Sequence, residues 1–361
     1  MKILEQASMG ALLLNNRVIM APMTRSRADD NGVISELAII YYAQRASAGL
    51  IISEAINISE QAIGMPNMPG LYTTEQVNAW RKVTDAVHAK GGKIFAQLHH
   101  SGRTAHSLNR KGQLPVGPSA IAIKNQQAYT PEGQKDFEIP RPLTTAEIKL
   151  IIEDYKAAAT NAMRAGFDGV ELHSALGYLP NQFLVESSNL RVDEYGGSVK
   201  NRSRFILETI QVLIQVVGEE RVGIKLSPSI AISNMFDRDP IELYSYLISE
   251  LDKKPIAYLH LMQPLFPLDE LPHYPKDVLT AFGQLITKTI IVNGGYNRET
   301  AELELQNNRS QFVSFGGLFL ANPDLPKRFE LNANLNEPDR STMYGGGDEK
   351  GYTDYPALNE H

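Results

Sequence analysis

The sequence predicts an α/β protein: a single (β/α)₈ TIM barrel with a long loop after its third strand and a C-terminal tail. Three observations predict this fold. Eight short apolar segments have the character of strands, and they mostly alternate with helical patterns. Such alternation favours a parallel sheet joined by helical crossovers. Eight units in roughly 330 residues fit one closed barrel, and polar residues follow most of the strands.

The predicted strands are short and apolar. They cover 17–21, 50–55, 93–97, 169–173, 222–226, 257–261, 289–292 and 311–315. In a β/α barrel the active site lies where the carboxyl ends of the strands meet. A doubly wound sheet is the alternative fold, but no Gly-x-Gly-x-x-Gly motif follows a strand in this chain.

Helical patterns separate several of these strands. The clearest runs from Thr144 to Gly166, because Thr144 and Glu147 fit a capping box and Gly166 suits a C-terminal stop. Further helices are predicted over 73–90, 201–217 and 240–251. The segment 104–142 has no clear period, as is usual for a lid or a binding loop. The polar region after residue 330 indicates a tail folded over the barrel.

Composition limits the classes of protein that this chain can be. It has 361 residues, a formal net charge of -6 and no cysteine, so no disulfide can form. No basic run favours nucleic acid. The N-terminus lacks a secretory pattern, and no apolar run reaches membrane-spanning length. We expect a soluble cytoplasmic protein, folded as one domain over 1–361, that acts on a small molecule. The sequence leaves monomer and homo-oligomer open.

The residues after the strands suggest an anion site and a proton donor. Gly294-Gly295 and Gly316-Gly317 follow the last two strands, where barrels often hold phosphate on backbone N–H groups. His173 and Tyr178 together suggest a donor to a carbonyl oxygen and a source of a proton. Lys225 is either a Schiff-base lysine or a cation that holds an anionic cofactor. A metal site at His99, His100 and His106 is disfavoured, because no acidic ligand falls at a convincing spacing.

Several motifs carry a resemblance that covers nearly the whole chain. They include Ala21-Pro22-Met23-Thr24-Arg25, His100-x-Gly102-Arg103 and the pair His173 and Tyr178, with further matches over 181–184, 189–202, 226–228, 321–325 and 351–356. On these motifs the chain resembles the Old Yellow Enzyme family of flavin ene-reductases. Within the family it is most similar to the bacterial N-ethylmaleimide reductase and pentaerythritol tetranitrate reductase branch.

The resemblance implies a barrel that binds FMN at its C-terminal face and oxidises NADPH or NADH. A nicotinamide would reduce the flavin, which would then give hydride from N5 to an activated alkene such as an enone, a maleimide or a nitroalkene. By resemblance, His173 polarises the substrate and Tyr178 protonates it. The residues implied to bind FMN are Pro22, Met23, Thr24, Ala55, Gln97, Lys225, Gly294, Gly295, Gly316 and Gly317. Those implied to bind substrate are His173, Leu176, Tyr178, Met65 and Tyr344.

The chain departs from the family pattern at five positions. Leu176 stands where the family usually has a His or Asn as second donor to the substrate oxygen, and losing such a bond costs roughly 1–3 kcal/mol. Lys225 and Gly317 replace arginines expected beside the flavin ring and its phosphate; Arg298 or Lys327 could substitute for the second. Met65 and His99 replace a common Tyr and Trp.

These departures keep other readings open. A redox-neutral flavin isomerase and a weakly active or non-catalytic flavin-binding relative are alternatives within the family. Outside it, a barrel aldolase could use Lys225 as a Schiff base over the phosphate site.

Overall fold

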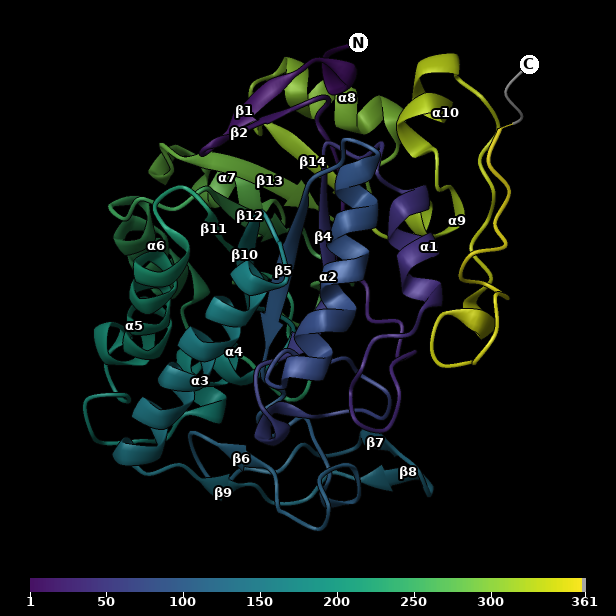
Figure 1. Cartoon of the computed structure of the whole chain (residues 1–361). Helices are drawn as coiled ribbons and strands as arrows, with labels where there is room; N and C mark the ends of the chain where they lie inside the picture. The colour runs from purple at the N-terminus through teal and green to yellow at the C-terminus, as the bar shows by residue number, and fades with distance from the viewer. Residues whose placement is uncertain (359–361) are drawn as a thin grey trace.

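Eight parallel strands close into a barrel in the computed structural model, which describes residues 1–358 (Figure 1). Around the barrel the strand order is β10-β11-β12-β13-β14-β3-β4-β5. The strands are β3 (Val18–Met20), β4 (Leu50–Asn57), β5 (Ile94–His99), β10 (Gly169–Ser174), β11 (Val222–Leu226), β12 (Tyr258–Met262), β13 (Thr289–Asn293) and β14 (Phe312–Phe315). All eight predicted strands are therefore confirmed, each within a few residues of its predicted ends.

Helices surround the barrel. They are α1 (Leu37–Gln44), α2 (Thr74–Ala89), α3 (Thr145–Arg164), α4 (Leu179–Leu184), α5 (Val199–Val217), α6 (Pro240–Asp252), α7 (Val278–Phe282), α8 (Arg298–Gln306), α9 (Gly317–Ala321) and α10 (Leu325–Leu331). Short 3₁₀ turns lie at Lys2–Leu4, Glu60–Ala62, Ser107–Asn109, Glu186–Ser188, Gly283–Leu285 and Arg340–Thr342. In residues 1–358 no helix is both long enough and apolar enough to pass through a bilayer.

The four predicted helices are confirmed as α2, α3, α5 and α6. The capping box of Thr144 and Glu147 forms, as does the one that begins α2, and Gly166 takes the positive φ of a C-terminal stop. Sequence reasoning missed the other six helices, α1, α4, α7, α8, α9 and α10, and two of them show why. The segment Leu37–Gln44 is almost wholly apolar, so it shows no helical period, and α8 buries only Ala301 and Leu305.

The interior of the barrel is apolar at its amino end. Its cluster includes Ile19, Ile52, Phe95, Tyr258, Ile291 and Phe312. Two strands must carry glycine in this layer: a Cβ at Gly169 would lie 2.4 Å from the ring of Phe95, and one at Gly223 would lie 2.1 Å from the ring of Tyr258. The glycines therefore let two large rings fill the barrel.

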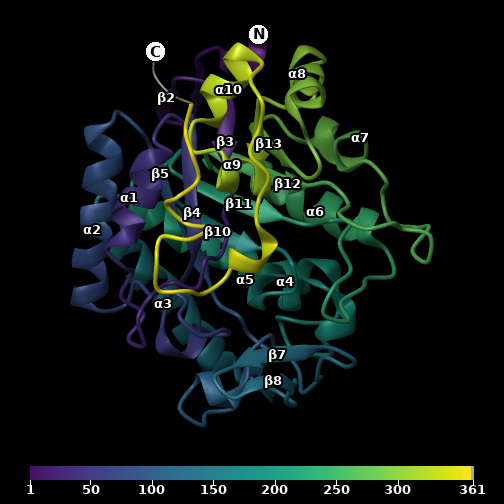
Figure 2. The ribbon, with the colours of Figure 1, turned by 90° about the vertical axis from the view of Figure 1, so that its right-hand side faces the viewer.

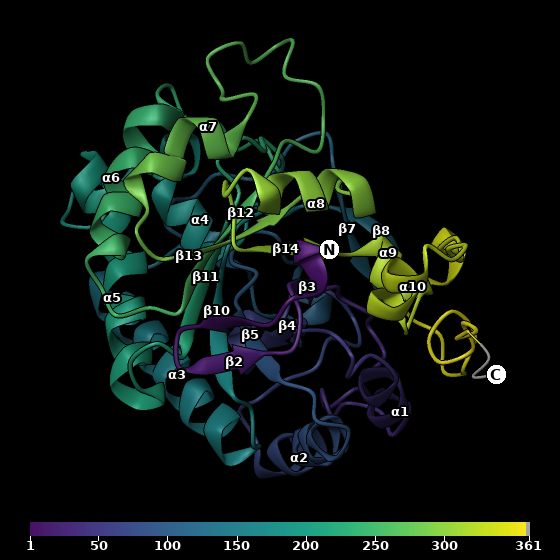
Figure 3. The same ribbon diagram turned by 90° about the horizontal axis from the view of Figure 1, so that it is seen from above.

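A short hairpin that sequence reasoning missed lies across the amino end. Strands β1 (Ala7–Met9) and β2 (Leu12–Leu14) are antiparallel, and Figure 3 shows them across that end of the barrel. Met9 and Leu14 are buried in the same cluster as the lower barrel layer. The hairpin thus closes the amino end with apolar side chains, which leaves the carboxyl end as the open mouth.

The long segment after β5 covers the mouth, at the bottom of Figure 1. It contains the antiparallel hairpin of β7 (Gln127–Thr130) and β8 (Gly133–Asp136) and the short parallel pair of β6 (Val116–Gly117) and β9 (Arg141–Pro142). The predicted irregular loop thus has some strand structure of its own, and its position over the mouth is that of a binding loop.

The C-terminal tail runs along one side of the barrel (Figure 2). Two buried arginines after β3, Arg25 and Arg27, hold it through its backbone, and they donate to the carbonyl oxygens of Met343, Gly351, Asp348 and Lys350. The ring of Tyr352 lies 4.9 Å from the Arg25 guanidinium carbon and 4.7 Å from that of Arg27. The predicted tail is therefore fixed to the loop that follows the first barrel strand.

Candidate active site

The barrel mouth holds a cavity of about 280 Å³ that gathers residues from distant parts of the sequence. It lies at the carboxyl ends of the strands, and its walls come from the loop after β3, from β5, β10 and α9, and from the tail. The lining residues are Pro22, Met23, Thr24, Gln97, His173, Leu176, Tyr178, Gly317, Leu320, Met343 and Tyr344. Of these, only Leu320 and Met343 were not among the predicted site residues.

A second chamber of about 200 Å³ adjoins the first and shares Leu176 and Tyr178 with it. Four of the five residues predicted to bind substrate line the first cavity. The fifth, Met65, lines this second chamber. Other lining residues include Met68, His99, Ala128, Tyr129, Phe137 and Ile232. Sequence reasoning missed Phe137 and Ile232, because they lie in segments without a period and the fold alone brings them to the site.

His173, Tyr178 and His99 form a group of rings between the two chambers. The ring centroid of Tyr178 lies 4.8 Å from that of His173 and 4.3 Å from that of His99, edge-on to both. The Nδ1 of His173 is buried and has no hydrogen-bond partner within residues 1–358. His99 differs, since its Nε2 lies 2.9 Å from Ser101 Oγ. The His173 imidazole therefore has a nitrogen free to bind a ligand.

Burial sets the protonation of these side chains. It lowers the pKa of His173 well below its ordinary value, helped by the neighbouring His99 and Lys225. It lowers the pKa of His99 to about 3. Burial, with a smaller effect of Tyr344, raises the pKa of Tyr178 to about 12. At neutral pH the two imidazoles are therefore uncharged and the phenol keeps its proton.

The turn that joins His173 to Tyr178 is tightly held. Asn181 Oδ1 accepts a hydrogen bond from the Gly177 N–H at 3.0 Å, and the Leu176 N–H donates to Ser227 Oγ at 2.9 Å. Leu176 has φ of +57°, in the left-handed region. This conformation costs an L-residue with a Cβ about 1–2 kcal/mol, and Asn and Gly adopt it more readily. The backbone at Leu176 is therefore strained.

A polar layer lies inside the barrel just below the mouth. Gln97 Nε2 donates to Glu171 Oε1 at 2.8 Å, and His260 Nδ1 lies 2.9 Å from Glu171 Oε2. Lys225 pairs in register with His173 on one side and His260 on the other. Lys225 is only 4% exposed. Burial, partly offset by Glu171, lowers the pKa of Lys225 to about 8.

Glu54 supports the site from below. Its carboxylate accepts a hydrogen bond from the Arg25 N–H at 3.1 Å, and its own N–H donates to the hydroxyl of Tyr42 at 2.9 Å. Burial raises the pKa of Glu54 to about 7. This acid within β4 therefore fixes the loop that carries Thr24, and it does not line the cavity.

The residues at the mouth fit a flavin nucleotide. A buried lysine suits the electron-rich edge of a bound ring or anion. Beside Gly295 the space is open, since a Cβ there would meet nothing within 4 Å, and at Gly316 and Gly317 it would meet its first atoms at 3.7 and 3.6 Å. Gly295, Gly316 and Gly317 thus leave room for a phosphate against the backbone, whereas a Cβ at Gly294 would lie 3.2 Å from Gln263 Cβ. Ala55 is buried in β4 and pairs in register with Gln97.

The two cations proposed to replace an arginine at position 317 are engaged elsewhere. Arg298 Nε donates to the carbonyl oxygen of Phe329 at 2.8 Å, and Lys327 Nζ donates to Glu330 at 2.7 Å. In this structure neither compensates for Gly317.

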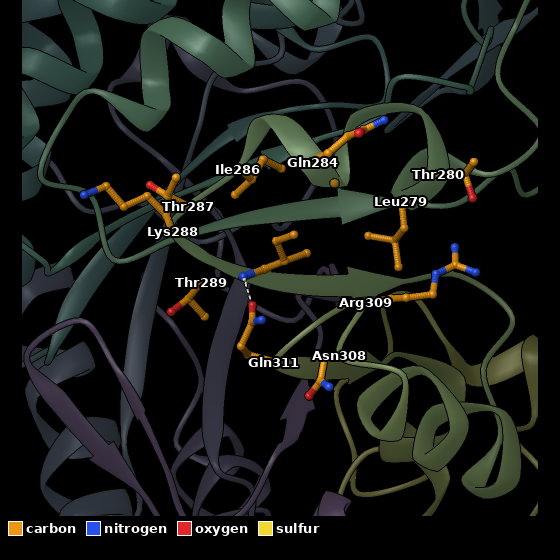
Figure 4. Close-up of a pocket in the computed structure, with 12 residues that line it drawn as sticks. Leu279, Thr280, Gln284, Ile286, Thr287, Lys288, Thr289, Asn308, Arg309 and Gln311 are labelled. Carbon is orange, nitrogen blue, oxygen red and sulfur yellow. Dashed lines mark hydrogen bonds between the residues drawn. The ribbon is translucent and has the colours of Figure 1, made fainter.

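A larger hollow elsewhere is not the site. It has a volume of about 620 Å³ and lies at the amino ends of β13 and β14, the end of the barrel opposite the mouth. Figure 4 shows its side chains spread along the surface, among them Lys288, Arg309 and Gln311. It contains none of the predicted site residues. Within residues 1–358 no group of three or more His, Cys, Asp or Glu could hold a metal ion, and His100 Nδ1 instead accepts a hydrogen bond from the Gly102 N–H.

Comparisons with known proteins agree with this geometry. The pattern of the NADH:flavin oxidoreductase / NADH oxidase family matches residues 3–336. The chain is 44% identical to 12-oxophytodienoate reductase 1 of Oryza sativa subsp. japonica over 98% of this chain and 92% of the relative. It is 41% identical to 12-oxophytodienoate reductase 2 of Arabidopsis thaliana, over 97% and 94%.

Solved structures are equally similar. Morphinone reductase in complex with tetrahydroNAD superposes with a TM-score of 0.94 at 46% identity, covering 99% of this chain and 98% of that one. An Old Yellow Enzyme homologue from Zymomonas mobilis gives a TM-score of 0.95 at 39% identity, covering 99% and 100%. The barrel and these matches show that this chain is an FMN- and NAD(P)H-dependent oxidoreductase of the NADH:flavin oxidoreductase / NADH oxidase family, also called the Old Yellow Enzyme family.

Proposed function

We propose that this protein reduces the carbon–carbon double bond of activated alkenes, with His173 as the group that polarises the substrate and Tyr178 as the proton donor. The observation that carries the proposal is the ring pair itself. An uncharged imidazole and a protonated phenol lie 4.8 Å apart between centroids, both buried, at the mouth of a flavin-binding barrel. A hydrogen-bond donor beside a proton donor is what addition to an α,β-unsaturated carbonyl compound requires.

The residues at the mouth would hold FMN. Pro22, Met23, Thr24, Ala55 and Gln97 would contact its ring system, Lys225 would place a positive charge beside it, and Gly294, Gly295, Gly316 and Gly317 would bind its phosphate. When bound, FMN supplies the two-electron chemistry: it takes hydride from a nicotinamide and passes it to the alkene.

His173 would bind the carbonyl oxygen of the substrate. Its pKa lies well below the ordinary value, so the imidazole is a neutral donor that does not protonate the oxygen outright. A neutral donor in a dry site can stabilise the negative charge that develops on that oxygen as the β-carbon accepts hydride. Because the imidazole has no other partner within residues 1–358, binding the oxygen breaks no hydrogen bond of the protein.

Tyr178 would deliver the proton to the α-carbon. Burial raises its pKa to about 12, so the phenol is fully protonated at neutral pH. It begins α4 directly after the turn, and it lies in the wall of both chambers. This position lets one hydroxyl reach a substrate that extends from the first cavity into the second.

The second chamber would bind the body of the substrate. Leu176, Met65 and Ile232 give it apolar walls, and Tyr344 closes the first cavity from the tail. Since Leu176 donates no hydrogen bond, His173 would be the main donor to the substrate oxygen. We therefore expect enones with one acceptor oxygen and an apolar body to be preferred.

The identity of the nicotinamide and the location of the protein are part of the same proposal. We propose NADPH as the reductant, with NADH as the alternative, and a cytoplasmic location, in keeping with a chain that has no cysteine. We also propose that residues 1–361 form one domain, of which 359–361 lie outside the described residues.

A visible spectrum of the purified protein, followed by anaerobic addition of NADPH and then of an enone, tests the function. A flavin spectrum that bleaches and then recovers supports it. Bleaching without recovery on any enone would contradict alkene reduction and favour another acceptor. A protein that stays colourless after addition of FMN would contradict the proposal as a whole. Borohydride trapping of Lys225 with a carbonyl compound would instead support the aldolase alternative.

A further inference from the structure

The polar layer below the mouth contains a hydrogen-bonded chain that the proposed reaction does not use. It consists of Glu171, His260 and Ser314, from three different barrel strands. His260 Nδ1 lies 2.9 Å from Glu171 Oε2, and His260 Nε2 lies 2.8 Å from Ser314 Oγ. The side chains of Glu171 and His260 are 0% exposed, and Ser314 is 2% exposed. A buried imidazole with a partner at each nitrogen suits a stored or exchangeable proton.

The neutral form of His260 accounts for every hydrogen in this chain. Burial alone would raise the pKa of Glu171, but His260, Lys225 and Gln97 outweigh it and lower that pKa, so the carboxylate is ionised and only accepts. His260 must then carry its proton on Nδ1 and donate to Glu171. Its Nε2 is bare and accepts a hydrogen bond from the Ser314 hydroxyl. Burial, followed by Lys225, lowers the pKa of His260, which favours this neutral form.

The same heavy atoms also accommodate the protonated form. The hydroxyl of Ser314 has a second acceptor, the carbonyl oxygen of Val292 at 3.4 Å. If a proton were added to His260 Nε2, that nitrogen would donate to Ser314 Oγ, and the hydroxyl hydrogen would turn toward Val292. Each N–H and O–H would again have an acceptor, and no side chain would have to move. Neither protonation state therefore carries the free-energy cost of a buried hydrogen-bonding group without a partner.

This hydrogen-bonded chain lies next to residues that are proposed to bind FMN. Lys225 on β11 pairs in register with His260, and Gln97 Nε2 donates a hydrogen bond to Glu171 Oε1. The titratable groups that face His260 are Glu171 and His173 from β10, Lys225 from β11 and Tyr258 from β12, while Ser314 faces it from β14. Added negative charge at the mouth would therefore act on His260 through a buried layer, where charges interact more strongly than in water.

We propose that His260 takes up a proton when the flavin bound at the mouth is reduced, with Ser314 switching its hydroxyl from His260 to the Val292 carbonyl. The inference rests on FMN binding at the mouth. Hydride transfer breaks a C–H bond of the nicotinamide and brings two electrons and one proton to the flavin, which gains one negative charge. A proton from solvent water adds to His260 Nε2 and balances that charge. No further oxidant or reductant is required.

The test compares oxidised and dithionite-reduced holoenzyme containing ¹⁵N-labelled histidine. Ring ¹⁵N shifts distinguish neutral imidazole from imidazolium, and His260→Asn assigns the signal. We expect His260 to be neutral in the oxidised protein and cationic in the reduced one. The midpoint potential of the flavin gives a second measurement, because each proton linked to a two-electron reduction contributes about 30 mV per pH unit. The midpoint potential of the wild type should fall by about 60 mV per pH unit over the pH range in which His260 takes up a proton on reduction.

Ser314→Ala is the informative variant, because it leaves a cationic Nε2–H without an acceptor while keeping the imidazole. Its potential should fall by only about 30 mV per pH unit. Ser310→Ala is the matched control. Ser310 is a buried serine at the entry to the same strand, and its hydroxyl has no hydrogen-bond partner within residues 1–358, so the wild-type slope should persist. A loss of slope in Lys225→Arg without a loss in Ser314→Ala would assign the proton to Lys225 and overturn the inference.

Failure of the inference can be told from failure of the function. A yellow, reducible holoenzyme whose His260 stays neutral on reduction overturns the inference alone. A protein that cannot be loaded with FMN overturns both.

Discussion

Replacing Leu176 by asparagine should raise both the thermal stability of the protein and the rate of the proposed reaction. Leu176 lines both chambers and has φ of +57°. Asparagine adopts the left-handed region more readily, so the change should recover much of the about 1–2 kcal/mol that the leucine pays. Its backbone bond to Ser227 is unaffected, because the N–H at position 176 donates it. We expect the melting temperature of the holoenzyme to rise by about 1–3 °C.

The same change adds a side-chain donor three residues after His173. One net hydrogen bond to the substrate oxygen is worth about 1 kcal/mol. If it forms fully in the transition state, kcat/KM for a simple cyclic enone should rise by about fivefold. The rate of flavin reduction by the nicotinamide gives a separate measurement, since the carbonyl oxygen of the enone takes no part in that step.

Leu176→Gly separates the two effects. Glycine relieves the same backbone strain and brings no donor, so its melting temperature tests the strain and its rate tests the hydrogen bond. Stopped-flow reoxidation of fully loaded, pre-reduced enzyme by the enone is the suitable assay. The reasoning is refuted if asparagine gives no faster reoxidation than leucine, or if glycine gives the same gain as asparagine.

Three further predictions concern the proton donor and the cofactor. Tyr178→Phe should slow reoxidation by an enone and leave flavin reduction by NADPH nearly unchanged, as rapid mixing of each half-reaction will show; equal losses in both would contradict the assigned role. Gly317→Arg should lower the Kd for FMN by about tenfold or more, because a charge-assisted hydrogen bond to phosphate is worth about 1.5–3 kcal/mol. A Cβ at this position has room, since it would lie 3.6 Å from Pro338 Cγ. Titration of the apoprotein with FMN checks this prediction. Lys225 has a pKa of about 8, lowered from 10.5 by burial, so its charge is present below that pH and is lost above it. FMN affinity should therefore weaken as the pH rises above about 8 in the wild type but not in Lys225→Arg, and parallel pH profiles would refute the role of Lys225.

The positions of single elements could be predicted from the sequence because their signals are local. Each barrel strand is a short apolar run between polar residues, and α3 carries its capping box, its apolar face and its terminal glycine within one stretch. His173 and Tyr178 could be placed at a strand tip for the same reason. Elements without a local pattern were missed: α1 is apolar on nearly all sides, and the β1–β2 hairpin has only three residues in each strand.

The tertiary structure alone decided how the polar residues are paired. Glu171, His260 and Ser314 lie 89 and 54 residues apart along the chain, and only closure of the barrel brings them within hydrogen-bond distance. It also decided that Arg25 and Arg27 hold the tail, which carries Tyr344 to the mouth. The fold class, the family and the chemistry of the strand tips could be predicted from the sequence, because they depend on spacing and residue type. Pairing depends on distances between remote segments, which packing sets and no local pattern records.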